Sequence, residues 1–574
     1  MQTFFEGPFE NGLFRGEEWK NRSAMVVVPH QDDEINLAGA TIRNLVQNHV
    51  RVYVVFCTTC DRLEPAEMRA AEGIRSCRSL GVTDDDIIFL GYSNGLCAAS
   101  GESVYNAAED GPVTNERQRT ETFDAGGRPE WHWLRSRTHH GFCRKNIRED
   151  LTDVLLTLRP DIIFAVDFDR HPDHRVFSLL FEEALGNILR QPDNAWFPEI
   201  YKGFAYNGSF LGARDFYSFL NLKGEVQAEK DYSNNLAFDT DFPPYVWAER
   251  VRLPLPAHCL SRTLNGNGLY GAVRAHFSQG MLHNAKRIFN SDQVFWRRRT
   301  DALSYKAAVT ATSGDPACLT DFKLADSSDV NAHPAYFDAG VWIPEAGDSR
   351  REVRMEFDSP QPVVRVTLHG NAESDSRVLK GLVRLSDGSE FPFGPLPPGG
   401  REYHIDFPLP HCITWLTLKL LETAGPAAGL AELQVYGSLY PQTQLRFLKL
   451  MVRDTFAYDY WVRDRQEIPL QLYRYDSRGV RVAEDAVPDD CMLLPVEPEG
   501  YELEGLRLRP GAGFRQAVLR VVQKDDPSVY DQIIIRRVSL PRLLQLRLVQ
   551  GLDAFMNRME HVIKTKYYKW FIRK

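Results

Sequence analysis

The sequence lacks the features of a membrane-spanning, a secreted or a nucleic-acid-binding protein. No uninterrupted apolar run approaches the roughly 20 residues of a membrane-spanning helix. The N-terminal segment has acidic residues and glycines where a secretory signal has a basic region and an apolar run, so we expect no such signal. A net charge of −9 over 574 residues is mildly acidic. A nucleic-acid partner would favour a basic surface, so we expect none.

Cysteine is also scarce, with nine residues in the chain, which is an odd number. Only Cys57 and Cys60 form a CxxC pair. This usage favours free thiols in a reducing compartment, and we expect a cytoplasmic protein. The CxxC pair fits either buried structural thiols or a redox or metal motif. Its place at the end of an apolar run favours the structural interpretation.

Apolar residues make up 43% and charged residues 25% of the chain, which is ordinary for globular proteins. The first part alternates strand and helix patterns. We expect strands at 24–29, 51–57, 86–90 and 161–166, and helices at 35–48, 67–80, 146–158 and 174–190. Such βα repeats predict an α/β domain with a mostly parallel sheet covered by helices, and we place it at 1–310.

Two parts of this domain do not follow the repeat. A polar, glycine-rich insertion between Leu96 and Gly141 is too long for an ordinary connection, and we interpret it as a lid or binding loop. Further along, the patterns of Ala272–His283 and Asn290–Ala302 predict two helices that close the domain.

The second half of the chain has short strand patterns separated by glycine and proline turns. We expect one all-β sandwich at 320–438 and a second at 439–540. From Pro541 the pattern is helical again, with an apolar seam. We therefore expect a basic amphipathic helix at 541–574.

Two short strings combine histidines with aspartates. PHQDDE begins at Pro29, after the first expected strand, and HPDH begins at His171, after the strand at 161–166. A helix follows each string. Alone, each string also fits a surface histidine or a helix N-cap. Together they lie at the carboxyl ends of strands, where α/β proteins build their sites.

Two imidazoles and one carboxylate match a catalytic zinc site, which leaves one position open for water. We assign three zinc ligands: His30, Asp33 and His174. Asp32 points away from its neighbour Asp33, so it is free to accept a proton from the water. We expect His171 to stabilise the developing oxyanion and the leaving amine. Asp173 would orient a histidine.

The two strings resemble the paired signatures of the PIG-L/LmbE-like de-N-acetylases, a zinc-dependent superfamily. The segments EMRAAEGIRSCRSLGV, FLGY and RAHFSQ extend the resemblance over about residues 22–305. It implies a Rossmann-like fold and removal of acetyl groups from N-acetylglucosamine units in glycolipids, small thiol precursors or antibiotics. It implies the same zinc ligands, Asp32 as the base, and Arg69 near the substrate.

The chain departs from the family pattern at Gln31, where the family has proline. It also has Thr58-Thr59-Cys60-Asp61 in place of a glycine-rich turn, which leaves the sugar open. His276 in RAHFSQ either faces the site or has a structural role, which we favour. Two other functions fit the sequence: a zinc amidase for a different N-acyl or thiol conjugate, and a non-catalytic glycan-binding scaffold. Iron in place of zinc also stays open.

Residues 325–437 resemble a discoidin-like, galactose-binding-like sandwich through RLSDGSEF and AGLAELQVYG. Such domains often hold glycans, and a structural role fits nearly as well. Trp342, His369 and Trp415 fit either sugar stacking or the core.

The segment from Pro541 has eight basic and two acidic residues, a net charge of +6, and ends in KTKYYKWFIRK. Cations mixed with aromatic residues are typical of a membrane interface. The helix fits membrane contact, which we favour, or packing on a sandwich or on a second copy. We expect a cytoplasmic deacetylase at the inner face of a bacterial membrane, acting on an N-acetylated sugar or glycolipid.

Overall fold

The computed structural model describes most of the chain. The described residues are 17–61, 65–97, 103–114, 117–169, 171–205, 251–253, 259, 267–279, 293–326, 340–372, 376–439, 447–452, 459–463, 467–475, 481–496, 499–527 and 529–571. Within these ranges, no helix combines the length and the apolar character needed to cross a membrane.

The first part of the chain is an α/β domain around one seven-stranded sheet of order β3-β2-β1-β4-β5-β7-β6. Its strands are β1 (Ser23–Val28), β2 (Arg51–Thr58), β3 (Ile87–Tyr92), β4 (Ile162–Val166), β5 (Glu199–Gly203), β6 (Val251–Leu253) and β7 (Gln293–Arg298). The strands β1 to β4 correspond to the four predicted strands and pair in parallel, as predicted. The strand β5 was not predicted and pairs in parallel with β4, whereas β7 pairs antiparallel with both β5 and β6. The strand order reverses between β1 and β4, which is the place in such a sheet where ligands usually bind.

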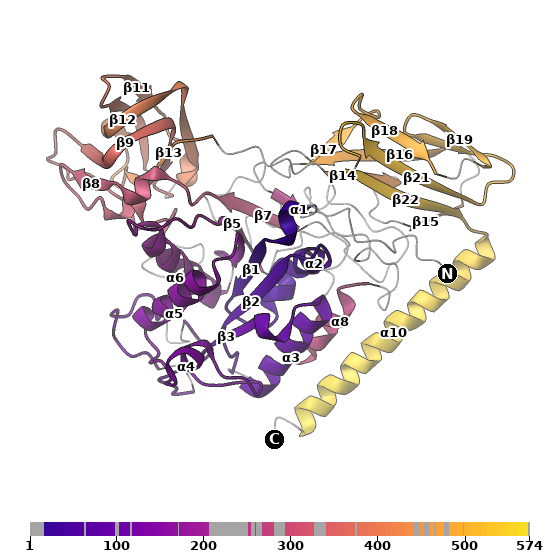
Figure 1. Ribbon diagram of the computed structural model, residues 1–574. Coiled ribbons are helices and arrows are strands. Elements are labelled where there is room, and N and C mark those ends of the chain that lie inside the picture. The colour runs from indigo at the N-terminus through magenta and orange to yellow at the C-terminus, as the bar shows by residue number, and fades with distance from the viewer. Residues whose placement is uncertain are drawn as a thin grey trace.

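Helices lie on both sides of this sheet (Figure 1). They are α1 (Glu17–Lys20), α2 (Asp33–Gln47), α3 (Ala66–Leu80), α4 (Trp131–Ser136), α5 (Arg144–Leu158), α6 (Pro172–Leu189) and α8 (Tyr270–Ala275). The apolar residues of β1 and β4 are fully buried because helices cover both faces of the sheet.

The prediction of a helix at Asn290–Ala302 is wrong. Residues 293–298 of the segment instead form β7, which pairs with β5 on one side and β6 on the other, and residues 290–292 lie outside the described residues. Its β-branched and aromatic residues Val294, Phe295 and Trp296 are buried against the sheet, and this packing prevails over the helical spacing. The helix predicted at Ala272–His283 is short, because α8 is followed by the 3-10 turn η5 (Phe277–Gln279). Residues 280–283 lie outside the described residues.

Two mostly antiparallel β units follow the α/β domain. The first contains β8 (Ala308–Ala311), β9 (Glu352–Gly370), β10 (Arg377–Leu385), β11 (Glu390–Phe393), β12 (Glu402–Ala424) and β13 (Leu430–Tyr436), all in one sheet. Trp342 and His369 are buried in this unit, which favours their core interpretation. Trp415 is half-buried, and the Arg354 guanidinium lies 4.3 Å from its ring centroid.

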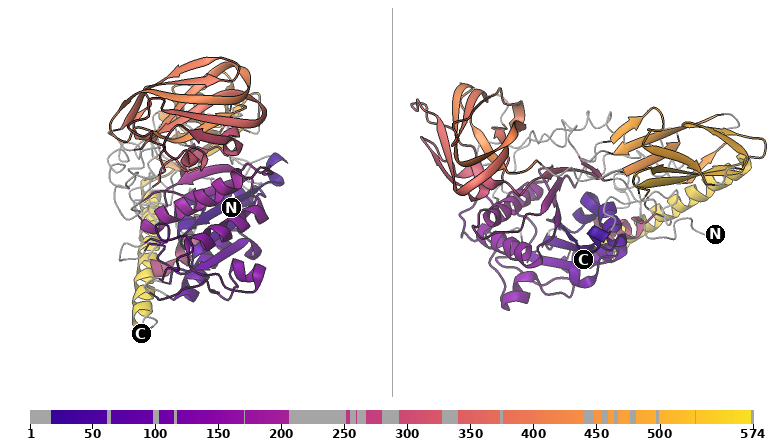
Figure 2. Two further views of the ribbon diagram at one scale, coloured as in Figure 1. Left: turned by 90° about the vertical axis from the view of Figure 1, so that its left-hand side faces the viewer. Right: turned by 45° about the horizontal axis from the view of Figure 1, so that its top comes forward.

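The second β unit has two sheets around one apolar core. Its strands are β14 (Phe447–Val452), β15 (Asp459–Val462), β16 (Ile468–Tyr475), β17 (Arg481–Glu484), β18 (Cys491–Pro495), β19 (Tyr501–Glu504), β20 (Arg507–Pro510), β21 (Gln516–Gln523) and β22 (Tyr530–Arg537). The helix α10 (Leu540–Phe571) then runs back along the outside of the molecule and lies against η5 (Figures 1 and 2).

The α/β domain and the first β unit are joined by close packing around α6. A Cβ atom added to Gly186 would overlap the carbonyl oxygen of Asp321, so only glycine allows this approach. The Arg298 guanidinium donates to Glu182 at 2.6 Å and to the carbonyl oxygen of Phe322. These contacts bury charged groups from separate elements together with their hydrogen-bond partners, as burial of charge requires.

Candidate active site

The turn between β1 and α2 places His30 and Asp33 side by side. The Asp33 carboxylate accepts the backbone N–H of His30 at 3.1 Å, and the Asp33 N–H donates to the carbonyl oxygen of His30 at 3.3 Å. Between them, Asp32 has a φ of 123°. That is a strained value for a residue with a side chain, and such strain is concentrated at functional sites.

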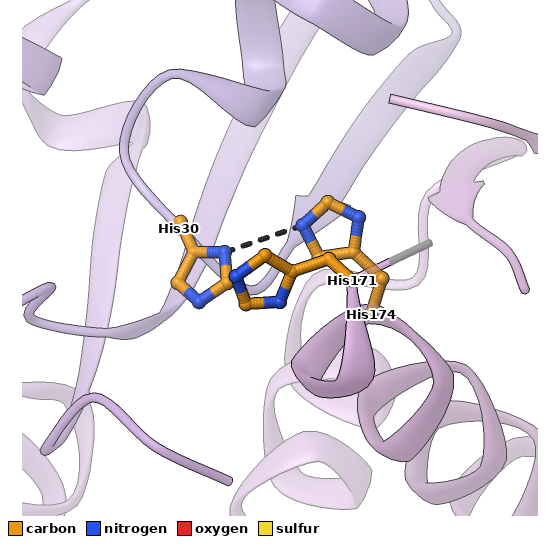
Figure 3. A group of neighbouring side chains, drawn as sticks. All are labelled: His30, His171 and His174. Atoms are coloured by element: carbon orange, nitrogen blue, oxygen red, sulfur yellow. Dashed lines mark hydrogen bonds between the residues drawn. The ribbon is translucent and has the colours of Figure 1, made fainter. Parts of the chain in front are cut away.

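The turn between β4 and α6 supplies the other two histidines. His171 is the N-cap of α6, and its Nδ1 accepts the backbone N–H of Asp173 at 3.2 Å. Pro172 occupies the first helical position, where its missing N–H costs nothing. His174 lies in the first turn of α6, and its ring is fully buried. Since β1 and β4 are neighbours, both turns lie at the same edge of the sheet, and the three histidines lie side by side there (Figure 3).

Three ligand atoms from these turns form a compact triangle. Asp33 Oδ2 lies 3.1 Å from His30 Nδ1 and 3.1 Å from His174 Nε2, and the two nitrogens are 3.3 Å apart. Ligand atoms on a tetrahedral ion with bonds of about 2.0 to 2.1 Å are separated by about 3.3 Å. The three assigned residues therefore fit a tetrahedral cation, and the structure brings them together as the two strings require.

Carboxylates outside the triangle fix the orientation of both histidines. Asp173 Oδ2 lies 3.1 Å from His30 Nε2 and also accepts the backbone N–H of Gly95, while Asp173 Oδ1 accepts the N–H of Cys97 at 2.8 Å. Although burial raises it, these hydrogen bonds lower the pKa of Asp173 to about 2. Asp173 thus orients His30, as expected of such a carboxylate.

Asp169 has the same relation to the other histidine, and the sequence analysis missed it. Its Oδ2 lies 2.7 Å from His174 Nδ1. Although burial lowers it, the charges of Asp169 and Asp33 raise the pKa of His174 to about 10. Asp169 stands two residues before the HPDH string, in the turn that follows β4. Its position at a strand end was the signal that could have identified it.

His171 is next to the triangle. Its ring centroid lies 4.8 Å from those of His30 and His174. Burial, and then the neighbouring imidazoles, lower the pKa of His171 to about 3, so the ring is neutral. Because Nδ1 accepts an N–H, the neutral ring carries its proton on Nε2 and can donate a hydrogen bond from there.

Arg69 pairs with the expected base, Asp32. Arg69 is buried, lies 3.5 Å from Asp32 Oδ1 and 3.8 Å from Glu72, and donates to the carbonyl oxygen of Gln31. Burial raises the pKa of Asp32, and the Arg69 charge reduces this effect. A raised pKa makes the Asp32 carboxylate a stronger base. The structure therefore places Arg69 beside the expected base, and its contact with the substrate stays a prediction.

The two segments that depart from the family pattern, Gln31 and Thr58-Thr59-Cys60-Asp61, contact each other. The Gln31 N–H, which proline lacks, donates to Cys60 Sγ at 3.3 Å, and the Gln31 side chain donates to the carbonyl oxygen of Thr58 at 2.6 Å. Cys57 and Cys60 are buried free thiols, in agreement with the structural interpretation. Asp61 accepts the N–H of Asn94 and the Ser93 hydroxyl.

The insertion lines a cleft of about 930 Å³ beside the site. Its wall combines Asp61 and Glu67 with Arg117, Arg119, Phe123 and His139. The segment that holds Asp61 also carries Gly95, which bonds to Asp173, so the cleft and the histidine site share one stretch of backbone. The interpretation of the insertion as a lid or binding loop stays a prediction.

A second histidine cluster joins the insertion to α5. The Nδ1 atoms of His132 and His140 each lie 3.0 Å from Asp150 Oδ1, and Tyr92 donates to Asp150 Oδ2 at 2.5 Å. The two rings stack with centroids 3.9 Å apart and an interplanar angle of 18°. One metal ion cannot lie in both of these nearly parallel ring planes. We interpret the cluster as a hydrogen-bonded clasp that holds the insertion.

Comparison with known proteins identifies the class of the α/β domain. Residues 25–185 match the family model of the PIG-L GlcNAc-PI de-N-acetylases. The chain therefore contains a PIG-L domain, and the match supports a hydrolase that acts on an N-acetyl amide bond. Residues 303–436 match the model of a domain of unknown function, DUF7402. No curated protein matches the chain.

Three solved structures have similar parts at low sequence identity. N,N'-diacetylchitobiose deacetylase from Pyrococcus horikoshii is 16% identical, with a TM-score of 0.23, over 51% of this chain and 87% of that one. The family 32 carbohydrate-binding module of NanJ from C. perfringens, in complex with galactose, is 12% identical, with a TM-score of 0.19, over 23% and 96%. A chitosan-binding module from Paenibacillus sp. IK-5 is 19% identical, with a TM-score of 0.17, over 24% and 98%.

Proposed function

We propose that the chain is a zinc-dependent deacetylase that removes the acetyl group from an N-acetylglucosamine-type sugar in a glycolipid, glycan or glycoconjugate precursor. The observation that carries the proposal is the triangle of His30, Asp33 and His174 beside Asp32, inside a PIG-L domain. Two imidazoles and one carboxylate suit zinc among the common divalent cations.

A cation held by this triangle supplies a Lewis acid and lowers the pKa of a water molecule. Asp32 accepts the proton of the attacking water as the new C–O bond forms at the acetamide carbonyl carbon. Arg69, 3.5 Å away, holds the Asp32 carboxylate in position. The neutral His171 donates from Nε2 to the tetrahedral oxyanion. When the C–N bond breaks, Asp32 returns the proton to the leaving amine, and acetate and the free amino sugar result.

The cleft beside the site supports a substrate larger than a single sugar. Arg117 and Arg119 provide cations there, and the Arg119 guanidinium lies over the Phe123 ring, 3.7 Å from its centroid. We propose that the cleft receives the carrier of the amino sugar.

We place this activity in the cytoplasm, a compartment that keeps thiols reduced. All nine cysteines are free thiols in the structure, which suits this placement. Cell fractionation that recovered the protein from outside the cytoplasm, or with oxidised thiols, would contradict it.

The test measures acetate release from a panel of free, nucleotide-linked and lipid-linked N-acetylhexosamines, with and without a chelator. Asp32→Ala should keep its metal content and lose about 10²-fold or more in turnover, as expected when a general base is removed. The exposed Asp193→Ala is the matched control and should match the unmodified enzyme. Undiminished turnover of Asp32→Ala, or acetate release unaffected by the chelator, would contradict the proposal.

A further inference from the structure

The helix α10 exposes a large apolar surface. Ten of its apolar side chains have exposed fractions between 38% and 66%. They include Leu548 (66%), Met556 (63%), Ile563 (60%), Phe555 (57%) and Leu552 (55%). Single exposed leucines are normal on proteins, but a group of this size on one helix marks an interaction surface.

These side chains share one face of the helix. Leu548, Leu552, Phe555, Met559 and Val562 follow one another at spacings of four and three residues. A second row, Val549, Met556 and Ile563, repeats every seven residues beside it. At 3.6 residues per turn, both rows fall within one stripe, which is the pattern of an amphipathic helix.

Charge decides which partner fits this stripe. The net charge of −9 for the chain and +6 for the segment from Pro541 leave −15 for the rest. In a pair of α10 helices, two segments that each carry a net charge of +6 would repel each other, which opposes pairing. An anionic lipid surface attracts the cations and accepts the apolar stripe between its head groups.

We propose that α10 docks flat on an anionic lipid bilayer, with its apolar stripe in the interface and its basic side chains at the lipid phosphates. The helix lies against η5, where Ser278 donates to Glu72, the neighbour of Arg69. Bilayer docking therefore holds the PIG-L domain at the lipid surface. At that surface the domain would have access to a lipid-linked amino sugar. Only this access rests on the proposed function.

The test sediments the full-length protein with vesicles of phosphatidylcholine alone or of phosphatidylcholine mixed with phosphatidylglycerol, in the absence of substrate. We expect binding to the mixed vesicles only, and weaker binding as salt rises. Binding is independent of catalysis, so its failure is distinguishable from failure of the deacetylase proposal. Acetate release from a water-soluble substrate is followed in parallel and should not change in any α10 variant.

Two sets of variants separate the apolar and the basic contributions. The triple variant Leu548→Ser, Leu552→Ser, Phe555→Ser should bind mixed vesicles at least about tenfold more weakly. The triple variant Arg542→Gln, Arg547→Gln, Arg558→Gln should also bind more weakly, and its binding should depend less steeply on salt. Circular dichroism of each variant checks that the helix is retained.

Exposed residues of the β units provide matched controls. Leu409→Ser, Leu421→Ser, Leu494→Ser replaces three apolar side chains that are 74%, 53% and 41% exposed. Arg384→Gln, Arg507→Gln, Arg509→Gln removes three exposed cations. Both controls should bind like the unmodified protein. Equal binding to neutral vesicles, or binding that the α10 variants and the controls change alike, would overturn the proposal. A dimer in sedimentation equilibrium that the serine variant abolishes, without vesicle binding, would overturn it in favour of a second copy.

Discussion

His276 Nε2 lies 2.6 Å from Glu34 Oε1, and both side chains are fully buried beneath the turn that carries Asp32. The second oxygen of Glu34 accepts the backbone N–H of Asp32 at 2.9 Å. His276 therefore acts through Glu34 on the strained backbone of the expected base, which agrees with the structural role that the sequence favoured.

We expect His276→Ala to lower kcat with little change in KM. His276 is fully buried, away from bound substrate, and its loss removes the fixed orientation of Asp32. Removing one partner of a buried ion pair should also cost about 3 kcal/mol or more in stability. The double variant Glu34→Gln, His276→Ala leaves no buried charge unpaired and should regain part of that stability. Steady-state kinetics and urea unfolding of the single and double variants measure both effects. A fall in stability with unchanged kcat would limit the pair to a role in folding.

Asp169→Asn should weaken metal binding by about 10- to 100-fold, the usual effect of removing a carboxylate that orients a ligating histidine. The amide keeps the shape of Asp169 but not the charge that faces His174 Nδ1 at 2.7 Å. Competition with a fluorescent chelator measures the affinity. The exposed Asp193→Asn serves as the control, and equal affinities in the two variants would exclude the orienting role.

The stability that the cluster of His132, His140 and Asp150 contributes should depend on pH. Burial lowers the pKa of His140, but the hydrogen bond and charge of Asp150 outweigh it, so the net shift is upward. A raised folded-state pKa gives stability that is complete below the unfolded value of about 6.5 and is lost as pH rises through the folded value.

We therefore expect His140→Gln to speed tryptic cleavage at the exposed Arg137, with a larger ratio to the unmodified protein at pH 6 than at pH 9. The exposed His404→Gln on β12 should leave this cleavage unchanged at both values. The same ratio at pH 6 and pH 9 for His140→Gln would mean that the charge of His140 does not contribute.

Gly186→Ala should destabilise the junction between α6 and the first β unit, because the new Cβ overlaps the carbonyl oxygen of Asp321. Overpacking of this kind costs about 1 to 3 kcal/mol. Gly347→Ala is the matched control, since a Cβ there meets no atom within 4 Å. Differential scanning calorimetry should show a lower transition temperature for Gly186→Ala only.

Much of the α/β domain follows from the sequence because its strands are short buried runs between amphipathic helices. The expected strand at 24–29 corresponds to β1, Ser23–Val28, and the expected helix at 67–80 to α3, Ala66–Leu80. The helix expected at Asn290–Ala302 is instead the strand β7, because its environment is set by β5 and β6, which local periodicity does not report.

The grouping of His30, Asp33 and His174 was also predictable, since both strings end parallel strands and such ends meet at one edge of a sheet. Asp169 could have been identified from its position after β4, although the sequence analysis did not do so. The pair of His276 and Glu34 was not predictable, because its hydrogen bond spans 242 residues and spacing along the chain carries no information about such pairs.

The adjacency of β1 and β4 has a consequence for how the site forms during folding. His30 and His174 are separated by 144 positions, and they meet only after the parallel strands that carry them have paired. Closing so long a loop is entropically slow, so the triangle should assemble late in folding. A fragment that ends before β4 has no site. If the chain were divided within the insertion, the two fragments would have to associate to recover the site.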